Sequence, residues 1–218
     1  MRVKTESRRQ AIIAAAAEVF GEMGFDAASM SEISARVGGS RVTLYNYFSS
    51  KEELLLEVIL ASAVQRRDEA ISALRASDDV EIGLRDFGTR YLKWMTSPGS
   101  LAMLRIGIAQ GGNSDIGRLY YERGPQPGWT AVADFLQTAI ANGQLRAEAP
   151  EVMTLQLKAL YEAGLVEFLL LGVMCEIDEE ELLLRATAAV DVFVRAYGTK
   201  QPVLAAGTTR HPGNRRKR

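Results

Sequence analysis

Two helix-start signals and a pair of glycines lie close together near the beginning of the chain. Residues 29–32 (SMSE) and 50–53 (SKEE) each place a serine three residues before a glutamate, the spacing of a capping box at a helix N-terminus. Between them, Gly38 and Gly39 allow the left-handed backbone that ends a helix in a sharp turn. These capping residues and glycines predict short helices that meet at tight turns.

The first 50 residues are therefore predicted to form three short helices. Gly21 and Gly24 close the first, residues 29–37 form the second, and a third is capped by Ser40 and ends near Phe48. Two short helices joined by a tight turn make a helix-turn-helix, whose second helix enters the major groove of DNA. This arrangement makes DNA the first candidate partner.

The third predicted helix carries a face suited to base edges and phosphates. A helix advances ~100° per residue, so Phe48 points to the core when Leu44 does. The remaining positions carry methyl, amide, phenol and guanidinium groups: Arg41, Val42, Thr43, Tyr45, Asn46 and Tyr47. Methyl groups suit thymine, amides bond adenine, guanidinium groups bond guanine, and phenols donate to phosphates. We predict that these residues bind DNA.

Three residues at helix starts complete the predicted DNA-binding set. They are the caps Ser29 and Ser40 and the lysine Lys51, whose ammonium could hold a phosphate beside the free N–H groups of the next helix. The alternative is that Tyr45 and Tyr47 pack partly against neighbouring helices and that Lys51 is a solvated surface charge.

The distribution of charge supports a polyanionic partner although the net charge is only −1. Residues 1–51 carry 7 basic and 5 acidic side chains, residues 52–209 carry 14 and 22, and residues 210–218 carry 5 basic side chains and no acidic one. An acidic body with basic ends is typical of chains that meet a polyanion. The alternative for the basic tail is that it only makes the protein more soluble and binds no polyanion.

The chain has too few cysteines and histidines for several classes of site. The chain has one cysteine, Cys175, and one histidine, His211, so an intrachain disulfide is impossible and a zinc cluster or a Ser-His-Asp triad is disfavoured. We expect no metal, no cofactor and no enzymatic activity, and we expect Cys175 to be a buried thiol. The longest apolar run contains Glu167 and is shorter than the ~20 residues of a membrane span, so we expect no membrane association and a cytoplasmic protein.

The rest of the chain has helical and not strand periodicity, which predicts an all-α fold. The predicted helices cover residues 51–75, 79–96, 101–110, 114–122, 128–142, 150–174 and 178–197. We divide the chain into a helix-turn-helix DNA-binding domain (1–51), a larger helical effector-binding and dimerisation domain (52–198) and a disordered basic tail (199–218).

Residues 8–55 resemble the TetR family of bacterial transcriptional repressors. The matches to its N-terminal signature are Ser29, Ile33, Gly38, Ser40, Thr43, Leu44, Tyr45, Tyr47, Phe48, Lys51, Glu52 and Leu54. This chain departs from that signature at Ser34, Gly39 and Val42, where the family usually has Ala, an apolar residue, and Gly, Ala or Pro. The segments FGTRYLKWMTSP, LYYERGP and ANGQLR are similar to the C-terminal domain of the AefR-like branch.

The resemblance implies a homodimer that binds a palindromic operator in double-stranded DNA. Its two recognition helices would lie in successive major grooves, ~35 Å apart, and a small effector bound by the larger domain would release the DNA. Helix 150–174 is apolar on most sides, and the last helix adds Ala186, Ala188 and Ala189. These helices could form a four-helix interface between two chains, or they could be interior helices of a monomer.

Candidates for an effector pocket are aromatic, Met and Ile side chains of the larger domain. They are Phe87, Tyr91, Trp94, Met95, Met103, Ile108, Tyr120, Trp129, Phe135, Tyr161 and Phe168. Such linings suit apolar ligands of variable shape, although each residue is more often plain core. Glu167 could meet a cationic ligand, pair across a dimer or face solvent. The second hypothesis for function is a dimeric DNA-binding regulator without an effector.

Overall fold

The computed structural model describes residues 5–199, apart from the side chains of residues 65 and 66, and its regular elements are helices. They are α1 (Glu6–Ala27), α2 (Met30–Val37), α3 (Arg41–Tyr47), α4 (Lys51–Ala76), α5 (Val80–Met95), α6 (Pro98–Ala109), α7 (Ile116–Arg123), α8 (Pro125–Ala141), α9 (Pro150–Glu162), α10 (Val166–Leu171) and α11 (Glu179–Tyr197). The all-α prediction is confirmed. The tail predicted to be disordered lies, from residue 200 onward, outside the described residues.

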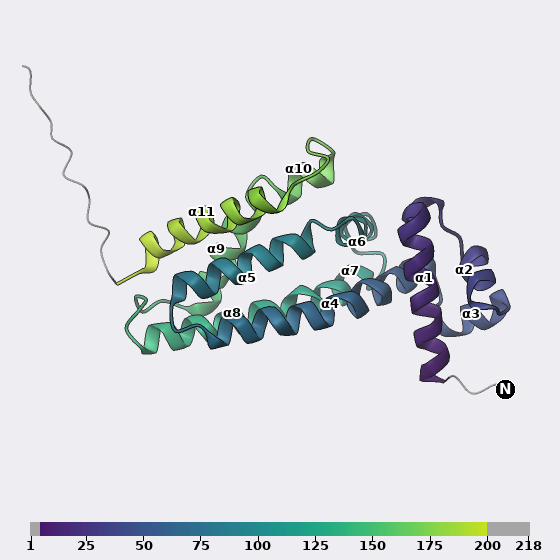
Figure 1. Ribbon diagram of the computed structural model, residues 1–218, viewed down its shortest axis with the longest axis horizontal. Helices are drawn as coiled ribbons and strands as arrows, with labels where there is room; N and C mark the ends of the chain where they lie inside the picture. The colour runs from purple at the N-terminus through teal and green to yellow at the C-terminus, as the bar shows by residue number, and fades with distance from the viewer. Residues whose placement is uncertain (1–4, 200–218) are drawn as a thin grey trace, which may run out of the picture.

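Helices α1–α3 form a small unit at one end of the long helix α4 (Figure 1). We call this unit the head. Its core consists of apolar side chains from α1, α2, α3 and the start of α4: Ile12, Ile13, Ala16, Val19, Ala28, Met30, Ile33, Leu44, Phe48 and Leu54. This core is distinct from the main core of the body, and Phe20 of α1 packs both on it and on a third apolar cluster formed by α4, α6 and α7.

The helix starts of the head largely follow the sequence signals. Ser29 and Glu32 form the predicted capping box, and Gly38 ends α2 in the left-handed region with φ 66°. The second box differs, because Ser50 accepts from the N–H of Glu53 whereas the Glu53 carboxylate accepts from the N–H of Ser49 at 2.6 Å. Ser50 thus caps α4, and the Glu53 carboxylate reaches back to Ser49 and not to Ser50.

Of the two glycines predicted to close the first helix, Gly24 interrupts its helical geometry and Gly21 does not. The helix continues to Ala27 with a kink at Gly24, whose φ of 76° and ψ of 164° are not helical. A glycine inside a helix costs only about 1 kcal/mol relative to alanine, so the packing of α1 carries the helix through Gly21.

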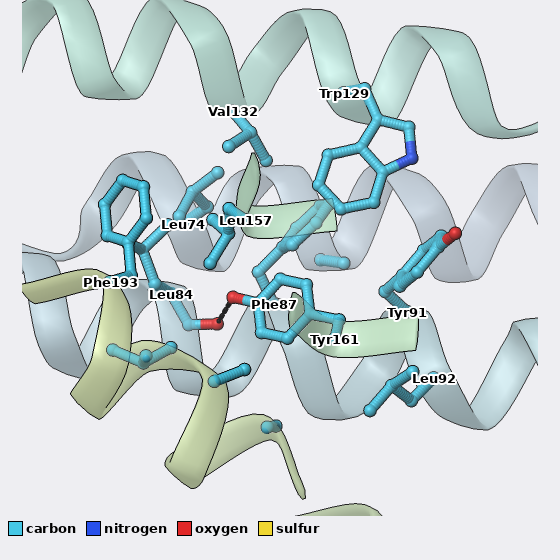
Figure 2. Packing of buried hydrophobic residues seen from close by; sticks show 14 of the residues in the cluster. Leu74, Leu84, Phe87, Tyr91, Leu92, Trp129, Val132, Leu157, Tyr161 and Phe193 are labelled. Atoms are coloured by element: carbon cyan, nitrogen blue, oxygen red, sulfur yellow. Dashed lines mark hydrogen bonds between the residues drawn. The ribbon is translucent and has the colours of Figure 1, made fainter. Parts of the chain in front are cut away.

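The remaining helices form a body in which α5 packs between α4 and α11 (Figure 1). Its main core joins residues of α4, α5, α8, α9 and α11, ten of which are labelled in Figure 2. Tyr161 of α9 lies at the centre, 1% exposed, and its hydroxyl donates to the carbonyl of Leu84 at 2.7 Å (Figure 2). Burial raises the pKa of this phenol well above its ordinary value.

Gly88 makes room for that ring. A Cβ at Gly88 would lie 2.4 Å from Cε1 of Tyr161, so any larger residue would displace the tyrosine. The packing of Tyr161 of α9 against α5 thus depends on a residue without a side chain.

Two sequence predictions about the end of the chain were wrong. Residues 150–174 form two helices, because the chain turns at Gly164, whose φ is 66°. Cys175 is exposed, because α10 ends at Gly172 in the left-handed region and the chain leaves the core before the cysteine. Ala186 is buried where α11 packs on α5 and α9, so the alanines of α11 partly serve packing within the chain.

In the part of the chain that the structure describes, helices of the length and apolarity needed to cross a membrane are absent.

Candidate functional site

The recognition helix α3 presents the face that its sequence indicated. Leu44 and Phe48 are each 1% exposed and hold the helix on the head. On the opposite side Val42 is 71% exposed and Tyr45 is 51% exposed, and both neighbours Arg41 and Asn46 are exposed as well. A short helix anchored on one side and open on the other can enter a groove of DNA.

Other members of the predicted DNA-binding set bind within the chain. The Ser40 hydroxyl accepts from the N–H of Thr43 at 3.1 Å, and the Ser29 hydroxyl donates to Glu32 at 2.7 Å. The Tyr47 hydroxyl accepts from the N–H of Thr5 at 2.9 Å, which ties the start of α1 to the end of α3. These three hydroxyls position the helices, and their contact with DNA stays a prediction.

Lys51 also has partners within the chain. Its ammonium donates to the carbonyls of Phe25 at 2.7 Å and Ala28 at 3.0 Å and lies 4.3 Å from the centre of the Phe25 ring. Carbonyls at a helix C-terminus attract a cation, so Lys51 stabilises the end of α1. A phosphate contact by Lys51 stays a prediction, and it requires the ammonium to leave these carbonyls.

Two departures from the family signature contact each other at the helix-turn-helix turn. The hydroxyl of Ser34 donates to the carbonyl of Gly39 at 2.7 Å. A Cβ at Gly39 would lie 2.5 Å from Nη2 of Arg8, which itself donates to the carbonyl of Gly38 at 3.1 Å. The Ser34 hydroxyl therefore stabilises the turn by its hydrogen bond to Gly39. Because Gly39 has no side chain, the guanidinium of Arg8 can reach the turn.

A cavity of about 400 Å³ lies in the body beside α4. Its wall comes from α4, α5 and the junction of α7 with α8: Ala63, Arg67, Glu69, Ala70, Phe87, Arg90, Tyr91, Lys93, Trp94, Gly124, Pro125 and Gly128. Three sequence candidates, Phe87, Tyr91 and Trp94, are in this wall. The sequence did not reveal the small residues of α4 and the glycines, which form a cavity only because they face these rings.

The chemistry of the cavity wall is mainly aromatic. The rings of Phe87 and Tyr91 are stacked with centroids 6.3 Å apart, and Trp94 lies 6.4 Å from Tyr91. Tyr91 donates its hydroxyl to the carboxylate of Glu162, and burial together with that carboxylate raises its pKa well above the ordinary value. The indole Nε1 of Trp94 is buried and has no hydrogen-bond partner among the described residues.

The cavity edge carries cations that pair on the surface. Arg90 pairs with Asp86 at 2.9 Å and Lys93 with Glu179 at 2.5 Å. Exposed pairs contribute about 0–1 kcal/mol, so these side chains can turn toward a bound group at small cost.

The other sequence candidates for the pocket lie elsewhere. Five are buried in the cores: Met95, Met103, Tyr120, Trp129 and Tyr161. Phe135 is half-buried in a separate depression beside α8, and Ile108 and Phe168 are exposed on the surface. Their contact with a ligand stays a prediction.

A third surface is apolar without a partner in this single chain. The outer sides of α9, α10 and α11 expose Val152, Leu155, Phe168, Leu171, Leu183, Leu184 and Val192. We call these residues the apolar face. Beside it, Glu167 borders a groove that Ile108 and Leu171 also line. Monomeric proteins rarely expose so many large aliphatic side chains on adjacent helices.

Comparison with known proteins agrees with these features. Residues 12–58 match the family model described as bacterial regulatory proteins, tetR family, and residues 82–199 match the AefR-like transcriptional repressor, C-terminal domain. The transcriptional regulator BetI of Rhizobium meliloti is 40% identical over 70 residues, 32% of this chain, and the match spans only 34% of BetI.

Two solved structures extend the likeness over most of the chain. A TetR-family transcriptional regulator from Mesorhizobium loti has a TM-score of 0.75 at 27% identity, and the match covers 89% of this chain and 100% of the regulator's chain. The flavonoid-responsive regulator FrrA has a TM-score of 0.62 at 29% identity and covers 90% and 100%. The C-terminal family model alone covers more than half of the 218 residues. The chain therefore belongs to the TetR family of DNA-binding bacterial transcriptional regulators, which are not enzymes, and carries an AefR-like C-terminal domain.

Proposed function

We propose that the protein is a cytoplasmic, dimeric transcriptional repressor whose grip on a palindromic operator is released by a small, mainly apolar effector. The observation that carries the proposal is the cavity beside α4, because α4 starts at the head and continues into the cavity wall. A ligand bound there touches the same helix that holds the DNA-binding unit. The effector can lower the affinity for DNA only if it binds more tightly to the conformer of the protein that does not bind DNA.

The proposed DNA contact uses the exposed face of α3. Replacing Tyr45 and Asn46 together by alanine should abolish binding to duplexes selected by the protein from a random pool, with the fold unchanged. Met23→Ala, an exposed residue of the head on α1, is the matched control and should bind as the wild type does. Retardation of the selected duplex by the double variant would contradict α3 as the reading element.

The apolar face supports the proposed dimer. Leu184, Ala188 and Val192 recur every four residues on α11 and are all exposed, and Leu155 of α9, a helix that packs on α11, is exposed as well. Two copies that met through this face would bury these residues around a two-fold axis. Leu184→Glu should halve the mass in light scattering, whereas Ile82→Glu, at an exposed position on α5, should not. A wild-type monomer would refute this part of the proposal.

The cavity wall favours an effector with a planar aromatic or acyl body. The aromatic rings supply the apolar contacts for such a ligand. The likeness to a regulator described as flavonoid-responsive supports the same class.

A panel of flavonoids, fatty acids and acyl-CoA thioesters tests this choice. At least one compound should weaken DNA binding by the wild-type protein. The same compound should not weaken DNA binding by the Ala63→Trp variant, in which the new indole fills the cavity and α3 is unchanged. If no compound changes the DNA affinity or the melting temperature, the second hypothesis, a dimeric regulator without an effector, replaces this one. A reporter behind the selected duplex separates repression, in which deletion of the protein raises transcription, from activation.

A further inference from the structure

A buried carboxylate lies where the head meets the body. Glu57 of α4 is 9% exposed, and two arginines from different parts of the chain share its carboxylate. Arg123 of α7 donates to both oxygens, from Nη1 to Oε1 at 2.5 Å and from Nη2 to Oε2 at 3.2 Å. Arg9 of α1 donates to Oε2. One carboxylate thus joins the head, α4 and the body.

The Arg9 end of this network continues to the recognition helix. The guanidinium of Arg9 lies 5.5 Å from the centre of the Phe48 ring. Phe48 is the C-cap of α3 and is 1% exposed, so its ring cannot move without moving the end of α3. A shift of Arg9 therefore reaches the reading helix through one packed ring.

The Arg123 end continues to the cavity. Arg123 directly precedes Gly124 and Pro125, which are both part of the cavity wall. Arg67, also in that wall, donates from Nη1 to the carbonyl of Arg123 at 3.3 Å. One turn earlier on α7, Tyr120 stacks on Trp94 with centroids 6.1 Å apart. A ligand that moves this part of the wall therefore acts beside the last turn of α7.

The network is directional, unlike the other contacts at this junction. Phe20 and Phe25 of the head also pack on α4 and its neighbours, but apolar contacts tolerate sliding. A bidentate guanidinium–carboxylate pair fixes both distance and angle. Burial alone would raise the pKa of Glu57, yet hydrogen bonds from Arg123 and Arg9 outweigh it and hold the pKa below its ordinary value. The carboxylate therefore stays ionised, and an ionised buried group is costly to leave without partners.

We infer that Arg123 is the positioning residue that couples the cavity to the head, through Glu57 and Arg9, in the effector response. This inference rests on the proposed function, because it requires both DNA binding and a ligand in the cavity. Displacement of Arg123 by a ligand leaves Glu57 with Arg9 as its remaining partner and so pulls α1 and the end of α3 to a new position.

The experiment measures coupling and not affinity alone. The probe is 8-anilinonaphthalene-1-sulfonate, an anionic aromatic dye, and its site is checked by loss of binding in Ala63→Trp. The Kd for the selected duplex is measured with and without saturating dye. Wild-type protein should show a ratio of about tenfold, within the usual range of allosteric coupling. In Arg123→Gln the ratio should fall to within about twofold of one, while the Kd for the dye changes by less than about threefold.

Two further variants separate coupling from a general loss of structure. Arg118→Gln is the matched control, because Arg118 is on the same helix and pairs only with the exposed Asp115 and Glu122 among the described residues. It should keep the wild-type ratio. Arg123→Lys keeps the charge but not the two-pronged contact and should give an intermediate ratio. If Arg123→Gln does not fold, Arg9→Gln breaks the same network from the head and should also lose the coupling.

The outcomes distinguish the inference from the function beneath it. A ratio retained in Arg123→Gln, or in Arg9→Gln where that variant is used, overturns the network while the effector-responsive function stands. A wild-type ratio of one with the dye and with every compound of the flavonoid, fatty-acid and acyl-CoA panel overturns the effector response, and the network falls with it.

Discussion

Replacing Gly88 by alanine should destabilise the body although alanine is the better helix former. The new Cβ would lie 2.4 Å from Cε1, 2.6 Å from Cζ and 2.9 Å from the hydroxyl oxygen of Tyr161. The ring has little room to retreat, because it is 1% exposed and its hydroxyl is bonded to the carbonyl of Leu84. Relief of the contact therefore shifts the ring and strains this hydrogen bond.

The opposing terms can be compared. Alanine gains about 1 kcal/mol over glycine inside a helix. Overpacking a tight core costs about 1–3 kcal/mol, and a buried hydroxyl left without its partner costs about 1–3 kcal/mol. We therefore expect Gly88→Ala to lower the free energy of unfolding by about 3 kcal/mol, a large share of the stability of an ordinary domain.

Urea denaturation followed by circular dichroism measures this change. In a Tyr161→Leu background the ring is gone, so Gly88→Ala should cost about nothing or stabilise by up to about 1 kcal/mol. Gly21→Ala on α1 is the matched control, because the structure describes no atom within 4 Å of the position of its Cβ apart from its own chain neighbours and helix backbone. It should be neutral or stabilising. An equal cost of Gly88→Ala in both backgrounds would refute the steric argument.

Three further predictions follow from the polar groups. Lys51→Met should destabilise the head by about 2 kcal/mol in urea denaturation, because it leaves the carbonyls at the end of α1 without a charged donor; a change below about 0.5 kcal/mol would contradict this role. The depressed pKa of Glu57 means that its contribution to stability is complete above the ordinary value of 4.5 and is lost as the pH falls below it, so Glu57→Gln should lose less stability than the wild type on acidification. Burial raises the pKa of Tyr120 to about 12 and that of Tyr161 further, so absorbance at 295 nm should show both phenols neutral at about pH 11 while the protein stays folded. These raised values add stability below the ordinary pKa of 10.0 that is lost as the pH rises through the folded values; ionisation of both near pH 10 would exclude the buried arrangement.

The sequence was most informative where local geometry decides the structure. Ser29 and Ser40 cap their helices, and the 100° advance per residue placed Leu44 and Phe48 inside and Val42 outside. These features depend on neighbours within one or two turns, which a single sequence displays.

Features that depend on distant partners escaped prediction. An apolar run does not show that Gly164 adopts the left-handed region, so α9 and α10 read as one helix. The partners of Lys51 are 23 or more residues away, and nothing in its own neighbourhood indicates them. The sequence could not show which candidates line a cavity, because a ring such as Trp129 fills a core and a ring such as Trp94 lines a cavity according to what packs opposite.

The attachment of Lys51 to the end of α1 makes the first turn of α4 and the head one rigid piece, with mechanical consequences for the response to a ligand. Ala70, in the cavity wall, lies about 28 Å along α4 from Lys51 at ~1.5 Å per residue. Over that arm a rotation of about 7° moves the head by about 3.4 Å, the rise of one base pair. The helix thus amplifies a displacement near the cavity that is too small to disrupt the core. Under the proposed dimeric function, release of DNA needs the two reading helices to lose their register on the duplex by only one base-pair step, without a large rearrangement of the protein.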